Sequence, residues 1–460
     1  MTTTTWAFYL ALTWSLVLYV YRFAVVGFNL SLFRLVVMGW LAVLALDLAR
    51  SRVRIERRYW PFAAIMAGIA MINAVDFVAL SGYPTLRRDI ANHAVNVVLS
   101  GLVLVYVRTQ AQIHGLLRAF VLSSIVTTAV ALYAGTMNAL PFERLIRTLG
   151  SEQARALTYV NDDTVFERAT STFFDPNFYG IYCMLVIVSI TYLWLHDRPA
   201  RHLAILFVVN LTCMTLTLSR TAVVGALAGF ALTFVLVPRA RRFAVGAAVA
   251  TVALLYASTV FQSYDGFAQL QDQAQSVVRS VQQLFAANGG RGAAAGGSGG
   301  SNDRDGSAER VESVQRNVRG RVADARSLQV RREFIDRGVA VFAKSPVFGR
   351  GSAGLVTPEM PLSTAHLTYI TLLARYGLIG TGVYFAYLFL PLALVWGTRT
   401  PPAPRLLVSL AIVPLLVVYL SYDIFMFFEV QYLFFGVAYA TAVHRPWAVA
   451  GTAADATGTS

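Results

Sequence analysis

The segment RREFIDRGVAVFAKSPVFGRGSAGLVTPEMPLSTAHLTYITLLARYGLIG, residues 331–380, organises the chain. Most of the sequence before it is apolar, whereas this segment combines basic side chains, a Ser-Pro turn and a histidine, His366. The residues after His366 are apolar and lead into another apolar block. We expect a water-facing loop to fold back over a membrane bundle here, with a short helix that begins at His366.

Composition predicts the class of protein. Hydrophobic residues make up 57% of the chain and charged residues 13%, against about 45–50% and about 25% in soluble domains. The apolar residues form repeated blocks near the length of about 20 residues that crosses a bilayer. The sequence therefore predicts an all-α polytopic membrane protein with about twelve transmembrane helices. The expected spans are residues 6–22, 30–48, 60–80, 91–107, 118–136, 177–195, 202–218, 221–237, 243–261, 378–397, 405–422 and 425–443.

The arginine-rich short loops indicate the orientation. They alternate with the other loops, so they share one side, and the positive-inside rule makes that side the cytoplasm. Both termini are then predicted to be cytoplasmic, and the start of the chain is expected to be a retained span because it lacks a basic n-region and a cleavage site. The arginine-rich loops are residues 50–58, 108–118, 198–201, 239–242 and 399–405, with Arg445 after the last span.

Three parts and a tail are expected from the same pattern. Residues 1–261 form a transmembrane bundle, residues 262–365 an extracytoplasmic loop, and residues 366–445 a short entry helix with the last three spans. The loop contains helical patterns at 269–287 and at about 308–343, joined by a tether whose Gly/Ser-rich part, 289–303, predicts flexibility. Residues 446–460 are expected to be a disordered cytoplasmic tail.

Basic motifs recur on the non-cytoplasmic side. Arg168 precedes TFFDPNFYG (172–180), where Asp175 or Asn177 can cap a helix that enters the membrane. Arg220 lies in the short LSRTA turn (218–222) between two spans. Each feature alone is typical of a helix entry or of an arginine at the membrane interface.

The third basic site is Arg331 with Arg332, on the second helix of the long loop. Topology places all three sites on one side, and a guanidinium group bonds phosphate oxygens bidentately, so a diphosphate headgroup suits this cluster. His366 lies on the same face. Its neutral imidazole is available near pH 7, which makes it a candidate proton acceptor.

These motifs, in this order, resemble the O-antigen ligase and O-antigen polymerase superfamily. The resemblance runs from RATSTFFDPN through LSRTA and SPVFGRG to AHLTYITLLARYGLIG, or from Arg168 to Gly380. It implies metal-independent, inverting glycosyl transfer from an undecaprenyl-diphosphate-linked glycan on the outer face of the bacterial cytoplasmic membrane. No cofactor is implied.

The resemblance also implies roles for single residues. Arg168, Arg220 and Arg331 would bind the diphosphate, and His366 would activate an acceptor hydroxyl. The chain departs from the family pattern at Leu367, where the family usually has asparagine, and at Arg375, where it usually has glutamate. Further candidates for the site are Arg332, Arg375, Asp175 and Asn177.

Two other classes of function account for parts of the same sequence. A flippase of lipid-linked oligosaccharides would also be polytopic and basic, but it predicts paired interruptions in two related halves, and no such repeat is visible. A scaffold for other polysaccharide-assembly proteins would leave the arginines and the histidine unexplained. Nucleic acid is not expected as a partner despite the pI near 10.0, because the arginines divide between the orientation signal and the outer loops.

Two enzyme activities, polymerase and ligase, differ only in the acceptor of the glycan. A polymerase would extend another lipid-linked repeat unit, whereas a ligase would transfer the glycan to a lipid A core. The departures around His366 favour a polymerase. No pattern typical of a metal site occurs in the outer loops, where the acidic run 161–163 comes nearest.

Reporter fusions test the orientation. Fusions at Arg54, Arg241 and Arg399 should report cytoplasm, and fusions near Gly82, Ala154 and Gly299 should report the other side, because arginine-rich loops stay inside. A fusion at Arg241 that reports the outside would contradict the assignment on which the site depends.

Overall fold

The computed structural model describes residues 3–18, 22–25, 28–50, 56–80, 82–137, 169, 171–173, 175–196, 201–263, 332–355, 367–398, 400–423, 425 and 428–444. The tether 289–303, the helix predicted at 269–287 and the tail 446–460 lie outside these residues, as do Arg168, Arg331 and His366.

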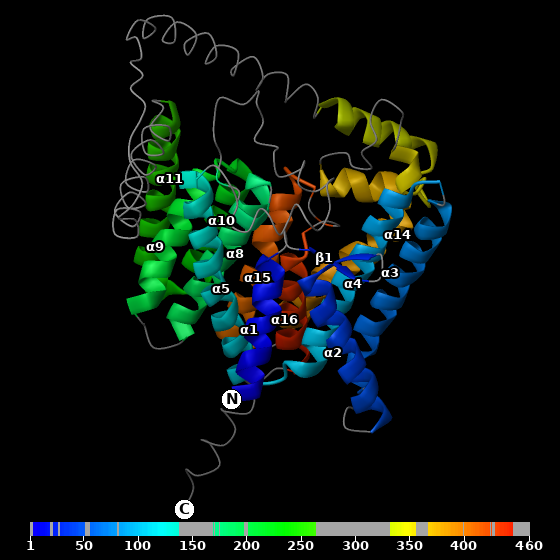
Figure 1. Ribbon diagram of the computed structural model, residues 1–460, viewed down its shortest axis with the longest axis horizontal. Helices are drawn as coiled ribbons and strands as arrows, with labels where there is room; N and C mark the ends of the chain where they lie inside the picture. Colours follow the sequence, from blue (N-terminus) through cyan, green and yellow to red (C-terminus); the bar gives the residue numbers. More distant parts are fainter. Residues whose placement is uncertain are drawn as a thin grey trace, which may run out of the picture.

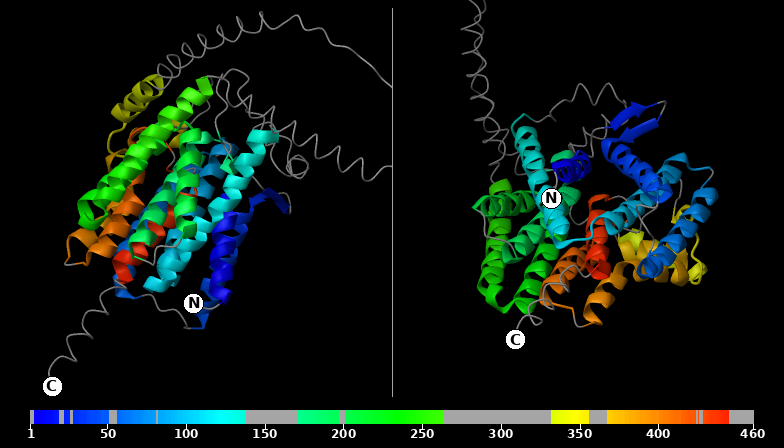
Figure 2. Two further views of the ribbon diagram at one scale, coloured as in Figure 1. Left: turned by 90° about the vertical axis from the view of Figure 1, so that its left-hand side faces the viewer. Right: turned by 90° about the horizontal axis from the view of Figure 1, so that it is seen from below.

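The described part of the chain is a bundle of apolar helices that run side by side (Figure 1 and Figure 2). Each predicted span overlaps one of them. The helices are α1 (Thr3–Val17), α2 (Leu32–Ala49), α3 (Trp60–Ala79), α4 (Pro84–Tyr106), α5 (Gln110–Met137), α8 (Pro176–His196), α9 (Arg201–Leu216), α10 (Arg220–Leu236), α11 (Arg241–Ser263), α14 (Thr368–Trp396), α15 (Pro402–Tyr419) and α16 (Val430–His444). A further helix, 332–344, lies outside the bundle (Figure 1).

Length and composition confirm the class of fold. Among the described residues, eight helices are long and apolar enough to cross a membrane, and shorter apolar helices accompany them. The protein is therefore an all-α polytopic membrane protein, apart from a two-stranded antiparallel hairpin, β1 (Arg22–Val25) and β2 (Phe28–Ser31), which the sequence did not predict. The total of about twelve crossings stays a prediction.

Burial separates central from peripheral helices. In α8, 83% of the most apolar stretch is buried, which fits a helix that is apolar all round. In α2, α3 and α11 the share is 22%, and large apolar side chains such as Met38 and Val78 remain exposed. Such faces suit contact with lipid chains in a protein that spans a membrane.

Helix α14 is interrupted at Gly377, whose φ of 60° and ψ of −164° are not helical. The segment 345–351, SPVFGRG, bonds the backbone groups on both sides of the break. The amides of Arg350 and Gly351 donate to the carbonyls of Ala374 and Arg375 at 3.0 and 2.8 Å. On the other side, the amides at 378 and 379 donate to the carbonyls at 346 and 347 at 2.8 and 3.2 Å. The break therefore leaves a short first part, 368–376, and a long second part, 378–396.

Glycine is required where these two segments meet. Gly349 and Gly377 both have positive φ, 72° and 60°, which L-residues with side chains rarely adopt. A Cβ atom at Gly377 would lie 2.4 Å from the backbone carbon of Val347, and one at Gly349 would lie 2.2 Å from the carbonyl oxygen of Arg375. The two motifs thus pack backbone against backbone.

The connection between the last two helices, α15 and α16, is longer than predicted. The spans predicted at 405–422 and 425–443 would leave almost no connection, but α15 ends at Tyr419 and α16 begins at Val430. The residues between them, LSYDIFMFFE, are mostly apolar, so hydropathy alone extends both spans into the connection. We call residues 420–429 the 420–429 loop.

Substitution of Gly377 by alanine should lower the melting temperature of the detergent-solubilised protein. The expected cost is about 1–3 kcal/mol for the strained backbone, with the contact to Val347 added to it. Gly382→Ala is the matched control, because it lies in the same helix with nothing within 4 Å of its added Cβ. Equal melting temperatures for the two variants would contradict the role of Gly377.

Candidate functional site

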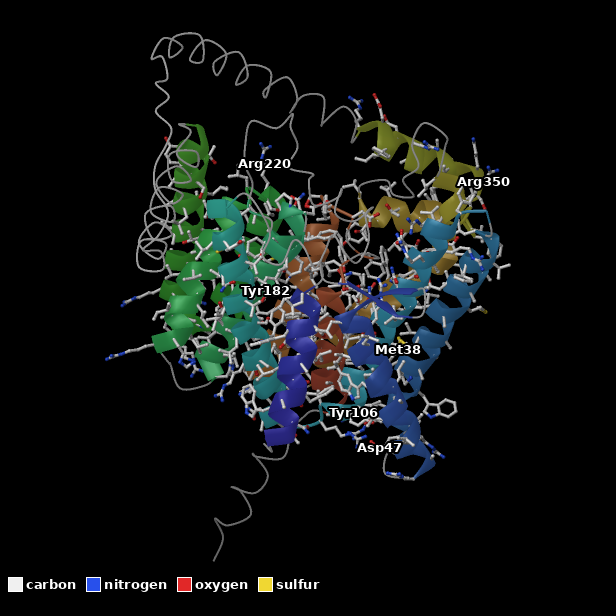
Figure 3. The ribbon with its side chains drawn as sticks, viewed as in Figure 1. Met38, Asp47, Tyr106, Tyr182, Arg220 and Arg350 are labelled. Carbon is white, nitrogen blue, oxygen red and sulfur yellow. The ribbon has the colours of Figure 1, made fainter. Side chains whose placement is uncertain are left out.

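The motifs singled out in the sequence meet at one end of the bundle, which we call the site end. The start of α8, the start of α10 and the start of α14 all contact the 420–429 loop there. Figure 3 shows Arg220 and Arg350 at this end and Asp47 and Tyr106 at the opposite end. Tyr106 donates to Asp47 at 3.0 Å, beside the arginine-rich loops predicted to be cytoplasmic. The site end is thus the end predicted to face away from the cytoplasm.

Asp175 directly precedes the first residue of α8 and also contacts another part of the chain. Its Oδ1 accepts a hydrogen bond from the backbone amide of Asn177 at 2.7 Å, which confirms the predicted cap. Its Oδ2 accepts from the hydroxyl of Tyr422 in the 420–429 loop at 2.6 Å. Asp175 and Asn177 are half-buried at this point. The DPN motif is therefore a helix entry with a tertiary contact.

The DPNFYG and LSRTA motifs pack directly against each other. A Cβ atom at Gly180 would lie 2.7 Å from Oγ1 of Thr217 and 2.9 Å from Cβ of Ser219. Ser219 caps α10 by accepting from the amide of Ala222 at 3.4 Å. The glycine of the first motif therefore fixes the position of the second.

Arg220 is the first residue of α10, and its side chain is exposed at the site end (Figure 3). The first amides of a helix carry partial positive charge, so a helix start with an exposed guanidinium favours an anion. Of the three arginines predicted to bind a diphosphate, Arg220 alone lies within the described residues. The contact of Arg220 with a phosphate stays a prediction.

The start of α14 is held by the same loop. The hydroxyl of Thr368 lies 3.1 Å from the carbonyl oxygen of Tyr422 and 3.3 Å from Oδ1 of Asp423. Thr368 is two residues after His366, which is itself outside the described residues. The backbone that continues from His366 is therefore fixed against the 420–429 loop.

The remaining predicted residues divide by exposure. Arg332 is exposed on helix 332–344 and lies 3.9 Å from the carboxylate of Asp336. Arg375, in contrast, is 2% exposed and lies inside the bundle. Its part in substrate binding stays a prediction.

Two arginines at the site end were not in the predicted site. Arg350, in SPVFGRG, is exposed beside the interruption of α14 (Figure 3). Arg34, in the first turn of α2, forms a buried ion pair of 4.0 Å with Glu429 of the 420–429 loop. The sequence could have indicated Arg350 as a site residue, because it is an arginine in a predicted outer loop. Arg34 lies within a predicted span, so no sequence feature indicated it.

A buried network supports the 420–429 loop from inside the bundle. The hydroxyl of Tyr432 donates to the carbonyl of Phe425 at 2.5 Å, so it accepts from Nδ1 of His93, 2.9 Å away. His93 Nε2 lies 3.1 Å from the hydroxyl of Tyr384, which donates to Oδ1 of Asn73 at 3.2 Å. Gln431 also donates to the Phe425 carbonyl, at 2.7 Å. Two residues of α16 thus hold one carbonyl of the loop, and His93 of α4 bonds one of the two.

Comparison with known protein families gives one match. Residues 205–385 match the model of the family described as O-antigen ligase. The matched segment includes Arg220, Arg331 and His366 but not Arg168 or Asp175. No curated protein matches the chain.

The fold and this match define a membrane-embedded enzyme of polysaccharide assembly. The chain carries the O-antigen ligase segment of the O-antigen ligase and polymerase superfamily, which confirms the resemblance in the sequence. The family and the apolar helices indicate an integral protein of the bacterial inner membrane. The class of substrate that the family implies is a lipid-linked glycan.

Substitution of His93 by phenylalanine should loosen the 420–429 loop. The change keeps the volume of the ring but removes both hydrogen bonds, at an expected cost of about 1–3 kcal/mol. Hydrogen exchange of the peptides that cover the loop should then accelerate. Ser100→Ala is the control, because it removes the bond between α4 and Tyr387 without contact to the loop. Similar exchange in both variants would contradict the network.

Proposed function

We propose that the protein transfers glycan from an undecaprenyl-diphosphate-linked donor to an acceptor hydroxyl at the outer surface of the membrane. The observation that carries the proposal is the position of Arg220, exposed at the start of α10 and fixed by Gly180 beside the 420–429 loop. A lipid-linked donor carries its diphosphate at that depth, and the family match supports lipid-linked glycan as its class.

The donor site would combine guanidinium groups with a helix start. Arg220, Arg168 and Arg331 would surround the diphosphate, and the amides of the first turn of α10 add partial positive charge. Negative charge grows on the diphosphate as the glycosidic bond breaks. Cations placed in advance therefore stabilise the transition state more than the ground state. Arg332 and Arg350, both exposed, are further candidates for this surface.

The acceptor side would use His366 as the base. Its imidazole would take the proton of the acceptor hydroxyl while that oxygen bonds to the anomeric carbon. The bond from this carbon to the phosphate oxygen breaks in the same displacement, which inverts the configuration and releases undecaprenyl diphosphate. Among the residues that the structure describes, no group of three or more His, Cys, Asp or Glu side chains is placed to hold a metal ion. That the reaction needs none is proposed from the resemblance.

The acceptor proposed first is another lipid-linked repeat unit, which makes the protein a polymerase of an exported polysaccharide. The departures from the family pattern at Leu367 and Arg375 support this choice, since both fall in the motif that contains the predicted base. Ligation to lipid A core is the alternative. Neighbouring genes for a flippase and a chain-length regulator would favour the polymerase.

A flippase stays the second class of function. The interruption of α14 is a feature that transporters also use, where unwound backbone binds the substrate. In this protein, however, the carbonyls of Ala374 and Arg375 already accept hydrogen bonds from 345–351. The interruption therefore joins α14 to the segment 345–351, and these two carbonyl groups are not left for a transported molecule.

Purified variants in nanodiscs, supplied with a lipid-linked donor, test the chemistry. His366→Ala should lower turnover about 10²–10⁴-fold with donor affinity nearly unchanged, because a base acts in the transition state. Arg220→Ala should lower both donor affinity and turnover. Arg220→Lys should restore little, because the bidentate fork is lost.

Arg241→Ala is the matched control for Arg220. It removes another exposed arginine at the start of a helix, at the opposite end of the bundle, so its turnover should match the wild type. Near-normal turnover in His366→Ala would show that the histidine is not the base. Loss of transfer in EDTA would overturn the metal-independent mechanism.

A further inference from the structure

We infer that Tyr422 is a positioning residue for this transfer: it holds the start of α14, which continues from His366, at a fixed distance from the arginine-bearing helix start. The inference rests on the proposed function. Its basis is the set of contacts made by three consecutive residues, Ser421, Tyr422 and Asp423, with three segments that the sequence motifs define.

Each contact goes to a different segment. The hydroxyl oxygens of Ser421 and Thr221 are 3.0 Å apart, and Thr221 follows Arg220 in α10. The hydroxyl of Tyr422 donates to Asp175 at the entry of α8. The carbonyl of Tyr422 and the carboxylate of Asp423 face the hydroxyl of Thr368. One short stretch therefore spaces the starts of α8, α10 and α14.

The bond from Tyr422 to Asp175 is the strongest of these contacts. A hydroxyl that donates to a carboxylate at 2.6 Å forms a charge-assisted bond, about twice as strong as a neutral one. The other carboxylate oxygen of Asp175 is occupied by the amide of Asn177, so the carboxylate cannot turn away. The ring of Tyr422 also packs edge-on against Phe178, with 6.1 Å between ring centroids.

The loop has a support of its own, because the Phe425 carbonyl is held by Gln431 and Tyr432 from inside the bundle. Arg220 has a second support, the contact of Gly180 with the LSRTA turn. The start of α14 contacts the loop through Thr368. Loss of the Tyr422 hydroxyl should therefore change the distance between the starts of α14 and α10, and a misplacement of about 1 Å at a reacting group can lower turnover about 10²-fold.

Tyr422→Phe tests the inference, because it removes one hydroxyl and keeps the ring. Tyr439→Phe is the matched control: its hydroxyl, on α16, donates to the carbonyl of Tyr387 on α14, also at 2.6 Å and away from the site end. Both variants should lower the melting temperature to a similar degree. Only Tyr422→Phe should lower kcat, by about 10-fold or more, with the donor KM within about twofold of the wild type.

Two further variants make the result specific. Thr368→Val removes the other end of the spacer with little change in volume, and it should give the same fall in kcat with an unchanged donor KM. Asp175→Asn keeps an oxygen that can accept from the amide of Asn177, and it should lower kcat little further in the Tyr422→Phe background, because both changes remove the bond between Tyr422 and Asp175. Equal loss of activity in Tyr422→Phe and Tyr439→Phe, or additive losses with Asp175→Asn, would overturn the inference.

The outcomes separate this inference from the proposed function. Normal turnover of Tyr422→Phe and Thr368→Val, with His366→Ala inactive, would overturn the positioning role alone. Absence of transfer by the wild type, or an active His366→Ala, would overturn the function on which it rests.

Discussion

A helix that is interrupted within or beside a membrane must bond the backbone groups that the interruption frees, because lipid offers them no partner. The break in α14 meets this constraint through the segment 345–351, whose amides and carbonyls bond both sides of Gly377. The short helix 368–376 can then turn away from the long part of α14 at the surface. The residues that continue from His366 are positioned as a result of this contact.

The same constraint explains why the motifs are rich in small residues. At Gly349 and Gly377 the two segments approach so closely that no side chain fits between them. At Gly180 the entry of α8 approaches the LSRTA turn in the same way. The glycines fix the distances between motifs. In the proposed reaction, the arginines of these motifs bind the diphosphate and the histidine accepts the proton.

The 420–429 loop is the point at which the motifs converge. It contacts α8 through Tyr422, α10 through Ser421, α14 through Asp423 and α2 through Glu429. These polar side chains lie among apolar neighbours, and the network around His93 holds the loop from beneath. A site assembled from four helix ends needs such a common support, since each end would otherwise move with its own helix.

The sequence by itself determined the class of fold, the approximate position of each helix and the family segment, because hydropathy and motif order are properties of neighbouring residues. It also placed Asp175 as a helix cap and Arg220 at a helix start. Only the tertiary structure decided that Arg375 is buried, that α14 is interrupted and bonded to 345–351, and that residues 420–429 form a loop. These features depend on contacts between residues that are distant in the sequence, such as His93 with Tyr432 and Arg34 with Glu429, and no local pattern encodes them.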